Sequence, residues 1–240
     1  APATSYRHRA RAPQSYGMPH ALVVGGNRGI GLELVRQLVA RGAASWRVSV
    51  ICRTPTAELA ALPVATHADI DVTSDAGLAA AKSALAGQPV DLLVVVAGLL
   101  ERNTLADLDV ESVRNQFEIN ALAPLRLVAA FADQLPAGAK VALLTSRMGS
   151  IADNDSGSHY GYRMSKAALN AAGKSLAIDL APRQIAVGIF HPGFVRTRMT
   201  GNQGLIDADE SARLLLQRID ELSPAESGVF RHANGERLPW

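Results

Sequence analysis

Short apolar runs alternate with stretches of helical periodicity along most of the chain, and this alternation constrains the fold more than any other sequence feature. The short runs predict strands at residues 21–24, 48–52, 64–70, 91–96, 140–145, 185–190 and 228–230. The stretches between them predict helices at residues 30–39, 75–85, 110–134, 160–180 and 207–222. A strand is therefore followed by a helix several times in succession.

This repetition predicts an α/β protein with a single Rossmann-type domain. The expected sheet is doubly wound, mostly parallel and seven-stranded, with helices on both faces. The chain has 240 residues, of which 48% are hydrophobic, enough for one substantial core. Ligands of such sheets bind at the carboxyl ends of the strands.

Residues 1–17 differ from the rest of the chain. They contain three arginines, two prolines and no acidic residue, and they have no apolar periodicity. We predict a flexible N-terminal extension here, followed by one domain at residues 18–240. An organellar transit peptide is an alternative interpretation, although an amphipathic face is missing. Without these arginines the domain is close to neutral, so no basic surface and no nucleic-acid partner is predicted.

Cysteine and histidine usage argues against a disulfide framework and against a metal site. Cys52 is the only cysteine, and the six histidines lack the spacing of metal ligands. The longest apolar run, residues 92–100, is too short to span a bilayer. We therefore expect a cytoplasmic protein without a membrane partner.

A glycine-rich turn follows the first expected strand, with the sequence Gly25-Gly26-Asn27-Arg28-Gly29-Ile30-Gly31. Glycines allow the backbone to approach a pyrophosphate, and the start of the next helix favours the phosphate charge. A plain connection between a strand and a helix would also explain a glycine-rich turn. Its place after the first strand of a βαβ series favours dinucleotide binding.

Basic residues near this turn indicate which dinucleotide binds. Arg53 stands at the end of the second expected strand, where NAD-specific sites usually have an acid. Its guanidinium suits a 2′-phosphate, and Arg28 supplies a second cation, so NADP(H) is the predicted cofactor. Either arginine could instead be a solvated surface residue. Asp71 and Val72 follow the third strand, and Asp71 either contacts the adenine or forms a helix cap or turn.

Tyr162 and Lys166 lie four residues apart at the start of an expected helix, so their side chains share one face. An adjacent ammonium and a cationic nicotinamide would lower the pKa of the phenol and suit it to acid–base chemistry. Tyr160 has Met164 at the same offset and is the weaker candidate. Because a Tyr-x-x-x-Lys pair also arises by chance on helix surfaces, it needs partners elsewhere in the chain.

Those partners are present, and the set resembles the short-chain dehydrogenase/reductase family from Pro19 to Trp240. The glycine turn matches the family's glycine motif, and Asp71 matches its adenine-site aspartate. Ala97-Gly98 matches the end of its Asn-Asn-Ala-Gly segment. Within the family, the amino-acid sequence around Tyr162 and the closing Leu238-Pro239-Trp240 resemble the branch of C-factor and sniffer-like carbonyl reductases.

The resemblance also implies a set of catalytic residues. Asn120, Ser146, Tyr162 and Lys166 match the family's catalytic tetrad. By this resemblance Ser146 hydrogen-bonds the substrate oxygen, Tyr162 gives it a proton, Lys166 binds the nicotinamide ribose and lowers the tyrosine pKa, and Asn120 holds a water of the proton relay. A further match, to the segment that holds the nicotinamide carboxamide, comprises Pro192, Gly193, Val195 and Thr197.

Three departures from the family pattern concern the scaffold around the site. Val24 stands where relatives have threonine, and Val95-Val96 replace two asparagines. The interval between Ser146 and Tyr162 is a few residues longer than usual, which predicts a mobile polar loop at residues 153–159. Because of this longer loop, the sequence does not determine how the Ser146 side chain is oriented toward a substrate.

The implied function is hydride transfer between NADPH and a small carbonyl or alcohol. The rival interpretation is a non-catalytic or signalling NADP-binding protein of the C-factor type, because fold alone does not establish turnover. His159 and His191 do not indicate a hydrolase, since no G-x-S-x-G turn accompanies them. An apolar pocket is expected from Leu99, Leu100, Met148, Phe194 and Met199. The long helices at 110–134 and 160–180 resemble those through which many members of the family pair, and this resemblance implies a homodimer or homotetramer.

Overall fold

The computed structural model describes residues 17–42 and 45–240. Apart from Gly17, the predicted N-terminal extension lies outside the described residues. Seven parallel strands form one sheet, as predicted, and their order in the sheet is β3-β2-β1-β4-β5-β6-β7. They are β1 (His20–Val24), β2 (Arg47–Ile51), β3 (Ala65–His67), β4 (Leu92–Val95), β5 (Lys140–Leu144), β6 (Ala186–His191) and β7 (Phe230–His232).

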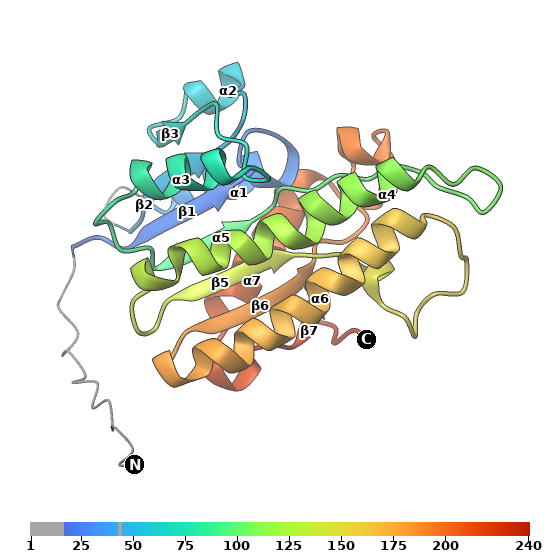
Figure 1. The fold of residues 1–240 in the computed structure, drawn as a ribbon. Coiled ribbons are helices and arrows are strands. Elements are labelled where there is room, and N and C mark those ends of the chain that lie inside the picture. Colours follow the sequence, from blue (N-terminus) through green and yellow to red (C-terminus); the bar gives the residue numbers. More distant parts are fainter. Residues whose placement is uncertain (1–16, 43–44) are drawn as a thin grey trace, which may run out of the picture.

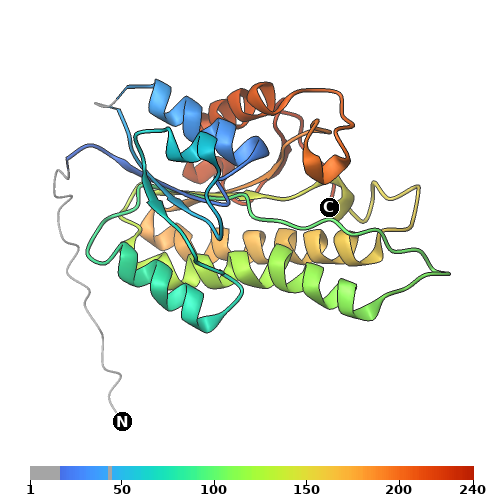
Figure 2. The same cartoon turned by 90° about the horizontal axis from the view of Figure 1, so that it is seen from above.

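Helices cover both faces of the sheet (Figures 1 and 2). One face carries α1 (Gly29–Ala40) and α7 (Ala208–Glu221). The other carries α3 (Asp75–Ala84), α4 (Val110–Phe117), α5 (Ala123–Phe131) and α6 (Tyr160–Leu180), while the short α2 (Ala57–Ala60) follows β2. Along β1, Ala21 and Val23 belong to one hydrophobic core and Leu22 and Val24 to the other, because successive side chains of a strand point to opposite faces.

The helix expected at residues 110–134 is divided in the structure. A π-helical turn, Glu118–Leu122, separates α4 from α5, and a 3-10 turn, Ala132–Gln134, ends the run. Pro124 has no backbone N–H, so it cannot donate the α-helical hydrogen bond to the carbonyl of Asn120. The hydrogen-bond pattern of the helix widens by one residue here, and the Ala123 N–H donates to the carbonyl of Glu118, five residues earlier.

The strand expected at 228–230 lies two residues later, as β7 (Phe230–His232). Two further differences concern β3 and the segment before it. β3 ends at His67 instead of residue 70, because Asp69 adopts the left-handed conformation (φ 57°) and leaves the extended backbone. α2 was not expected; it begins where the Thr56 hydroxyl accepts a hydrogen bond from the Leu59 N–H. Both differences lie outside the sheet's centre and leave its order unchanged.

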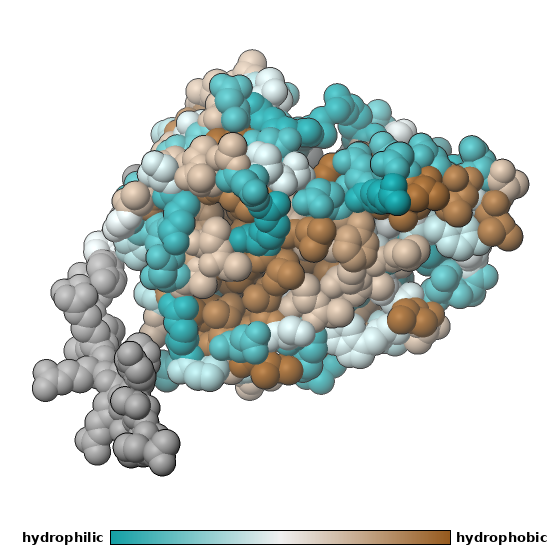
Figure 3. All heavy atoms as spheres, in the orientation of Figure 1, coloured by the Kyte–Doolittle hydropathy of each residue, from teal (hydrophilic) through white to brown (hydrophobic). Residues whose placement is uncertain are grey.

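The helices beside the sheet also present apolar side chains to solvent. Figure 3 shows brown and tan residues gathered over the middle of the face formed by α5 and α6. Leu125 is 37% exposed on α5 and Ile178 is 62% exposed on α6, and Leu122 and Met164 are exposed nearby. Such an apolar area on a helical face is typical of an interaction surface.

His20 connects the first two strands to the loop before β4. Its ring is fully buried, with Nδ1 2.9 Å from the carbonyl oxygen of Pro89 and Nε2 2.8 Å from Oγ of Ser49. Because a carbonyl only accepts, Nδ1 carries the proton and Nε2 accepts from the Ser49 hydroxyl. Burial lowers the pKa of His20 below its ordinary value of 6.5.

This lowered pKa predicts acid sensitivity of the fold. The unfolded chain takes up the His20 proton first, so the stabilisation is present above about pH 6.5 and is lost as the pH falls through the folded-state pKa. His20→Leu leaves the Pro89 carbonyl without its donor, and we expect a loss of about 1–3 kcal/mol at pH 7.5. Urea denaturation at pH 7.5 and 5.5 should show a smaller acid-induced loss in this variant than in wild type.

Ser49→Ala is the matched control, because it removes one partner of the ring without removing the titrating group. It should keep the wild-type dependence of stability on pH. An equal loss of unfolding free energy on acidification in wild type and in His20→Leu would contradict the role given to His20.

Candidate active site

The candidate catalytic side chains meet at the carboxyl edge of the sheet, which is on the right in Figure 1. Tyr162 and Lys166 lie in the first turns of α6, Ser146 caps the 3-10 turn Arg147–Gly149 after β5, and Asn120 lies in the π-helical turn. All four side chains are buried, with exposed fractions between 0% and 8%. The structure therefore brings together residues that are up to 46 positions apart in the sequence.

The entry into α6 is fixed by polar contacts. Ser158 and His159 both have positive φ angles, and the His159 N–H donates to the carbonyl of Asn103 at 2.7 Å. The Arg163 guanidinium donates to the carbonyls of Gly157 and Ser158, and to the Ser156 hydroxyl. The long loop after Ser146, which sequence analysis predicts to be mobile, is thus tied at its end to the helix that carries Tyr162.

Lys166 lies beneath the tyrosine ring and inside the protein. Its Nζ is 5.8 Å from the centroid of the Tyr162 ring and donates a hydrogen bond of 2.9 Å to the Leu144 carbonyl. A Cβ at Gly98 would lie 3.6 Å from this Nζ, an ordinary contact distance, and 3.3 Å from Oδ1 of Asn120, which is tight. Glycine after β4 therefore leaves room for the Asn120 amide next to the ammonium.

Burial shifts the pKa of both residues toward the neutral form. It raises the pKa of Tyr162 to about 12, and the Ser146 hydroxyl partly offsets this by favouring the phenolate. It lowers the pKa of Lys166 to about 8. In the chain alone, desolvation thus outweighs the lowering of the phenol pKa that sequence analysis expects from Lys166, and Tyr162 carries its proton at neutral pH.

Asn120 is held by both atoms of its amide. Its Nδ2 donates to the Leu99 carbonyl (2.8 Å) and to Oγ of Ser165 (3.0 Å), and its Oδ1 accepts from the Leu99 N–H (2.8 Å). The Ser165 hydroxyl in turn donates to the Tyr162 carbonyl at 2.9 Å. Sequence analysis missed Ser165; its only signal was a small polar residue next to Lys166 on the same helix.

Ser146 is positioned by contacts between β5 and α6. Its Oγ accepts from the Met148 N–H at 3.2 Å. The preceding Thr145 donates its hydroxyl proton to Oδ1 of Asn170 at 2.6 Å, and Asn170 donates to the Gly149 carbonyl. A Cβ at Gly149 would lie 2.8 Å from the Lys166 carbonyl carbon, so the turn and the helix touch through their backbones. The serine is fixed by these contacts, although the loop that follows is exposed.

The glycine turn has the shape of a phosphate cradle. A Cβ at Gly25 would lie 2.8 Å from the Ala97 nitrogen, and one at Gly31 would lie 2.2 Å from the Gly25 carbonyl oxygen. Arg28 is the N-cap residue of α1, its side chain caps no N–H group, and the first turn has no acid, which leaves the first N–H groups of the helix for an anion. Gly25, Asn27, Arg28, Gly29, Ile30 and Gly31 therefore fit a dinucleotide pyrophosphate.

The end of β2 is tied to this turn. Asn27 donates its amide to the Thr54 carbonyl, and the Thr56 hydroxyl donates to the Asn27 carbonyl, both at 2.9 Å. These bonds place Arg53 near Arg28, and both side chains are exposed. Two cations at this position fit a 2′-phosphate.

Asp71 forms a turn before α3. Its Oδ1 accepts from the Thr73 N–H at 3.0 Å and from the Thr73 hydroxyl at 2.7 Å, and these bonds lower its pKa. The turn role that sequence analysis held open is therefore present. Contact of Asp71 and Val72 with an adenine stays a prediction.

The segment after β6 completes the edge. Gly193 has φ 97°, the Pro192 carbonyl accepts from the Ser211 hydroxyl, and Val195 pairs with Ile206. A Cβ at Gly29 would lie 3.6 Å from Cγ2 of Thr197, so this segment touches the glycine turn. Ala97-Gly98 lies between them, beside Gly25 and Asn120.

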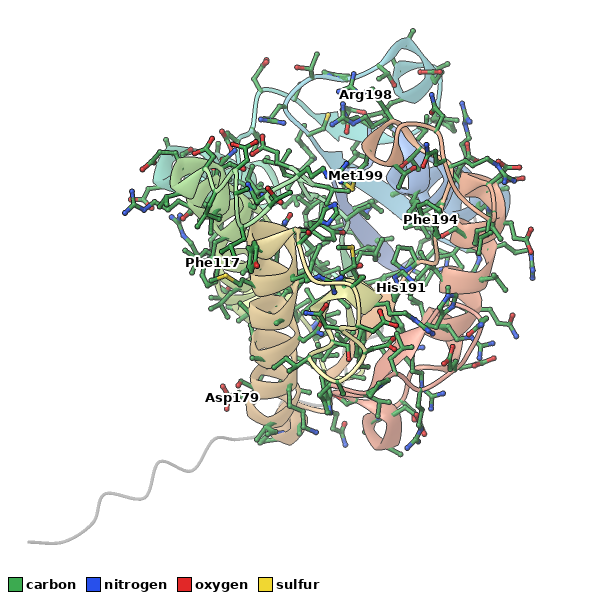
Figure 4. All side chains as sticks on the ribbon, turned by 90° about the vertical axis from the view of Figure 1, so that its right-hand side faces the viewer. Phe117, Asp179, His191, Phe194, Arg198 and Met199 are labelled. Carbon is green, nitrogen blue, oxygen red and sulfur yellow. The ribbon has the colours of Figure 1, made fainter. Side chains whose placement is uncertain are left out.

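Apolar and histidine side chains lie around this edge. Phe194 and Met199 are 49% and 45% exposed, and Figure 4 shows both between Arg198 and His191 in that view. Leu99, Leu100 and Met148 are half-buried. His191 packs edge-to-face against His232 with ring centroids 4.8 Å apart, and burial lowers its pKa to about 3, so it is a neutral packing residue.

Membrane-spanning helices and metal-binding clusters are both absent from the part of the chain that the structure describes. None of its helices is both long enough and apolar enough to cross a membrane. Within residues 17–42 and 45–240, no group of three or more histidine, cysteine or acidic residues is arranged to hold a metal ion.

The amino-acid sequence matches the family model described as short chain dehydrogenase over residues 19–205. It is 38% identical over 229 residues to 1-hydroxy-2-glutathionyl-2-methyl-3-butene dehydrogenase of Rhodococcus sp. (strain AD45), and the match covers 93% of this chain and 100% of that protein. It is 44% identical over 155 residues to C-signal of Myxococcus xanthus, covering 63% of this chain and 93% of that protein.

Solved structures give the same result. The carbonyl reductase Sniffer of D. melanogaster superimposes with a TM-score of 0.83 at 29% identity, covering 93% of this chain and 100% of that one. The NADPH-bound carbonyl reductase from chicken fatty liver also gives 0.83, at 28% identity, covering 94% and 100%. With its fold, its glycine turn and its buried tyrosine and lysine, the chain belongs to the short-chain dehydrogenase/reductase family of oxidoreductases.

Proposed function

We propose that the protein is an NADP(H)-dependent oxidoreductase that interconverts a small carbonyl compound and its alcohol. The observation that carries this proposal is the buried pair of Tyr162 and Lys166 beside Ser146, at the sheet edge that also carries the glycine turn. Similar solved structures include carbonyl reductases with bound NADPH or NADP, which supports the same cofactor here.

In this proposal the residues of the chain divide the work. The cofactor supplies or accepts the hydride when bound. Tyr162 holds a proton at neutral pH and gives it to the substrate oxygen, while the Ser146 hydroxyl donates a hydrogen bond to the same oxygen. When Tyr162 has lost its proton, the Lys166 ammonium stabilises the phenolate by its charge.

Asn120 takes the part in the proton path that the resemblance implies, but through its main chain and not through its side chain. Its side chain is fully used by Leu99 and Ser165. Its main-chain carbonyl lacks the usual helical donor because residue 124 is proline. We therefore assign the binding of a relay water to this carbonyl and the fixing of the π-helical turn to the amide.

The second candidate is a binding or signalling protein of the C-factor type, which the similarity to C-signal favours. A protein that only binds NADP(H) has no need for a buried tyrosine beside a serine hydroxyl. The two candidates differ in one measurable property, which is the turnover of NADPH with a carbonyl substrate.

Tyr162→Phe is expected to abolish turnover and to leave NADPH affinity nearly unchanged. The variant keeps the ring that packs near Lys166 and removes only the proton donor, a change that typically costs about two to four orders of magnitude in rate. NADPH oxidation with a panel of aldehydes and ketones measures the rate, and fluorescence titration measures affinity.

Tyr160→Phe is the matched control, since Tyr160 lies one half-turn earlier on α6, is 37% exposed and should be silent. A Tyr162→Phe enzyme that reduces a carbonyl at near wild-type rate would show that the proton comes from another group. If wild type reduces no carbonyl in the panel, the binding-protein candidate replaces the enzyme.

The cofactor assignment predicts a preference for NADPH over NADH. Arg28 and Arg53 are exposed and near one another, and each forms charge-assisted bonds with a 2′-phosphate far better than with a hydroxyl. We expect NADPH to bind at least about tenfold more tightly, which corresponds to about 1.4 kcal/mol. Equal affinities in a calorimetric titration would exclude the assignment.

We also propose a homodimer or homotetramer formed through the helical face. Leu122, Leu125, Met164 and Ile178 place apolar side chains on the exposed surface of α5, α6 and the turn before α5 (Figure 3). Light scattering at micromolar concentration should give at least twice the chain mass of 25.3 kDa. Leu125→Lys should shift the protein toward the monomer, and a monomeric wild type would rule out the assembly.

A further inference from the structure

The segment between β6 and α7 forms a self-supported flap, which we define as residues 194–206. Val195 pairs with Ile206, and the Thr200 hydroxyl donates to the Val195 carbonyl at 2.8 Å. The Arg196 guanidinium donates to Oδ1 of Asp207 at 2.6 Å and to the Gly204 carbonyl at 2.9 Å. These bonds give the flap a fixed shape of its own, which includes the 3-10 turn Arg198–Thr200.

The flap brings one arginine to the glycine turn. Thr197 is in van der Waals reach of Gly29, since a Cβ at that glycine would lie 3.6 Å from its Cγ2. Arg198 follows directly, and Figure 4 shows it at the top of the flap, toward the loops that follow β1 and β2, with Met199 and Phe194 below it. An arginine from the second half of the chain thus stands near Arg28 of the first half.

Three arginines gather here without carboxylates to neutralise them. Among the described residues, no ion pair within 4.0 Å involves Arg28, Arg53 or Arg198, whereas the flap's other arginine, Arg196, is paired with Asp207. The pKa of Arg28 is lowered, first by burial and then by the positive charges of Arg198 and Arg53. The charge of Arg53 contributes to the lowered pKa of Asp71, but Oδ1 of Asp71 accepts its hydrogen bonds from Thr73.

Like charges that approach one another repel unless an anion lies between them. All three side chains are exposed, so they could point apart into water at little cost. The fixed flap and the turn at Arg28 instead hold the bases of these side chains together. The cluster therefore has the charge and the position of a site for a multiply charged phosphate ligand.

We propose that Arg198 is a third arginine of the cofactor's phosphate site and joins the flap to the glycine turn through that phosphate. The inference rests on the proposed use of NADP(H). It adds a binding residue that belongs to a different half of the chain from Arg28 and Arg53. The same flap carries Phe194 and Met199, so cofactor binding also fixes the apolar side chains beside the reaction site.

The test is cofactor affinity, which does not depend on turnover. Arg198→Gln should weaken NADPH binding about tenfold or more in calorimetric titration, and Arg198→Lys should retain most of the affinity because it keeps the charge. Arg213→Gln is the matched control: Arg213 is an exposed arginine on α7 whose nearest acid, Glu210, lies 4.0 Å away on its own helix. It should bind NADPH like wild type.

Two ligands identify the phosphate that Arg198 contacts. Loss of affinity for adenosine 2′,5′-bisphosphate with NADH affinity unchanged places the contact at the 2′-phosphate, and loss of NADH affinity places it at the pyrophosphate; either result supports the proposal. Hydrogen exchange of residues 194–206 should slow when NADP⁺ binds to wild type and should change less in Arg198→Gln.

The proposal is overturned if Arg198→Gln binds NADPH within twofold of wild type while Arg28→Gln binds it more weakly. It is also overturned if wild type binds neither NADPH nor NADH. If Arg198→Gln weakens binding but wild type turns over no carbonyl, the proposed reaction fails and the phosphate contact stands.

Discussion

The ammonium of Lys166 is the group on which the arrangement of the site depends. A buried charge is tolerated only when it is hydrogen-bonded, and here the Leu144 carbonyl at the end of β5 accepts from it. That bond ties the first turns of α6 to the centre of the sheet. Because Tyr162 is one helical turn before Lys166, the same bond fixes the phenol beside the serine that follows β5.

The neighbouring elements are adapted to this buried lysine. Gly98 leaves room for the Asn120 amide, and Gly149 lets the turn after Ser146 touch the backbone of α6 at Lys166. Asn120 uses its amide to hold Leu99 and Ser165, which is the residue before the lysine. The helix containing Asn120 widens into a π turn because Pro124 lacks an N–H, so a single proline shapes the backbone at the reaction site.

A second group of positive charges lies around the glycine turn, and it differs from Lys166 in having no partner within the part of the protein that the structure describes. Lys166 is one cation that the protein satisfies by itself, whereas Arg28, Arg53 and Arg198 form a group of cations that the protein leaves to a ligand. The first arrangement fixes the position of Tyr162, whose own burial keeps it protonated at neutral pH. The second is the phosphate site that we propose for the cofactor, and the flap that carries Arg198 lies between the two regions in this proposal.

The sequence by itself determined the βαβ order, the seven strands and the identity of the glycine turn and of Tyr162 and Lys166. Hydrophobic period and local spacing are short-range properties, and they suffice for the strands and the glycine turn. Tyr162 and Lys166 are singled out because the other motifs of the family stand in the same order along the chain. Sequence analysis did not find the π turn at 118–122, the role of Ser165 or the position of Arg198. Only the tertiary structure decided these, along with the raised pKa of Tyr162, because each depends on desolvation or on contacts between residues far apart in the chain.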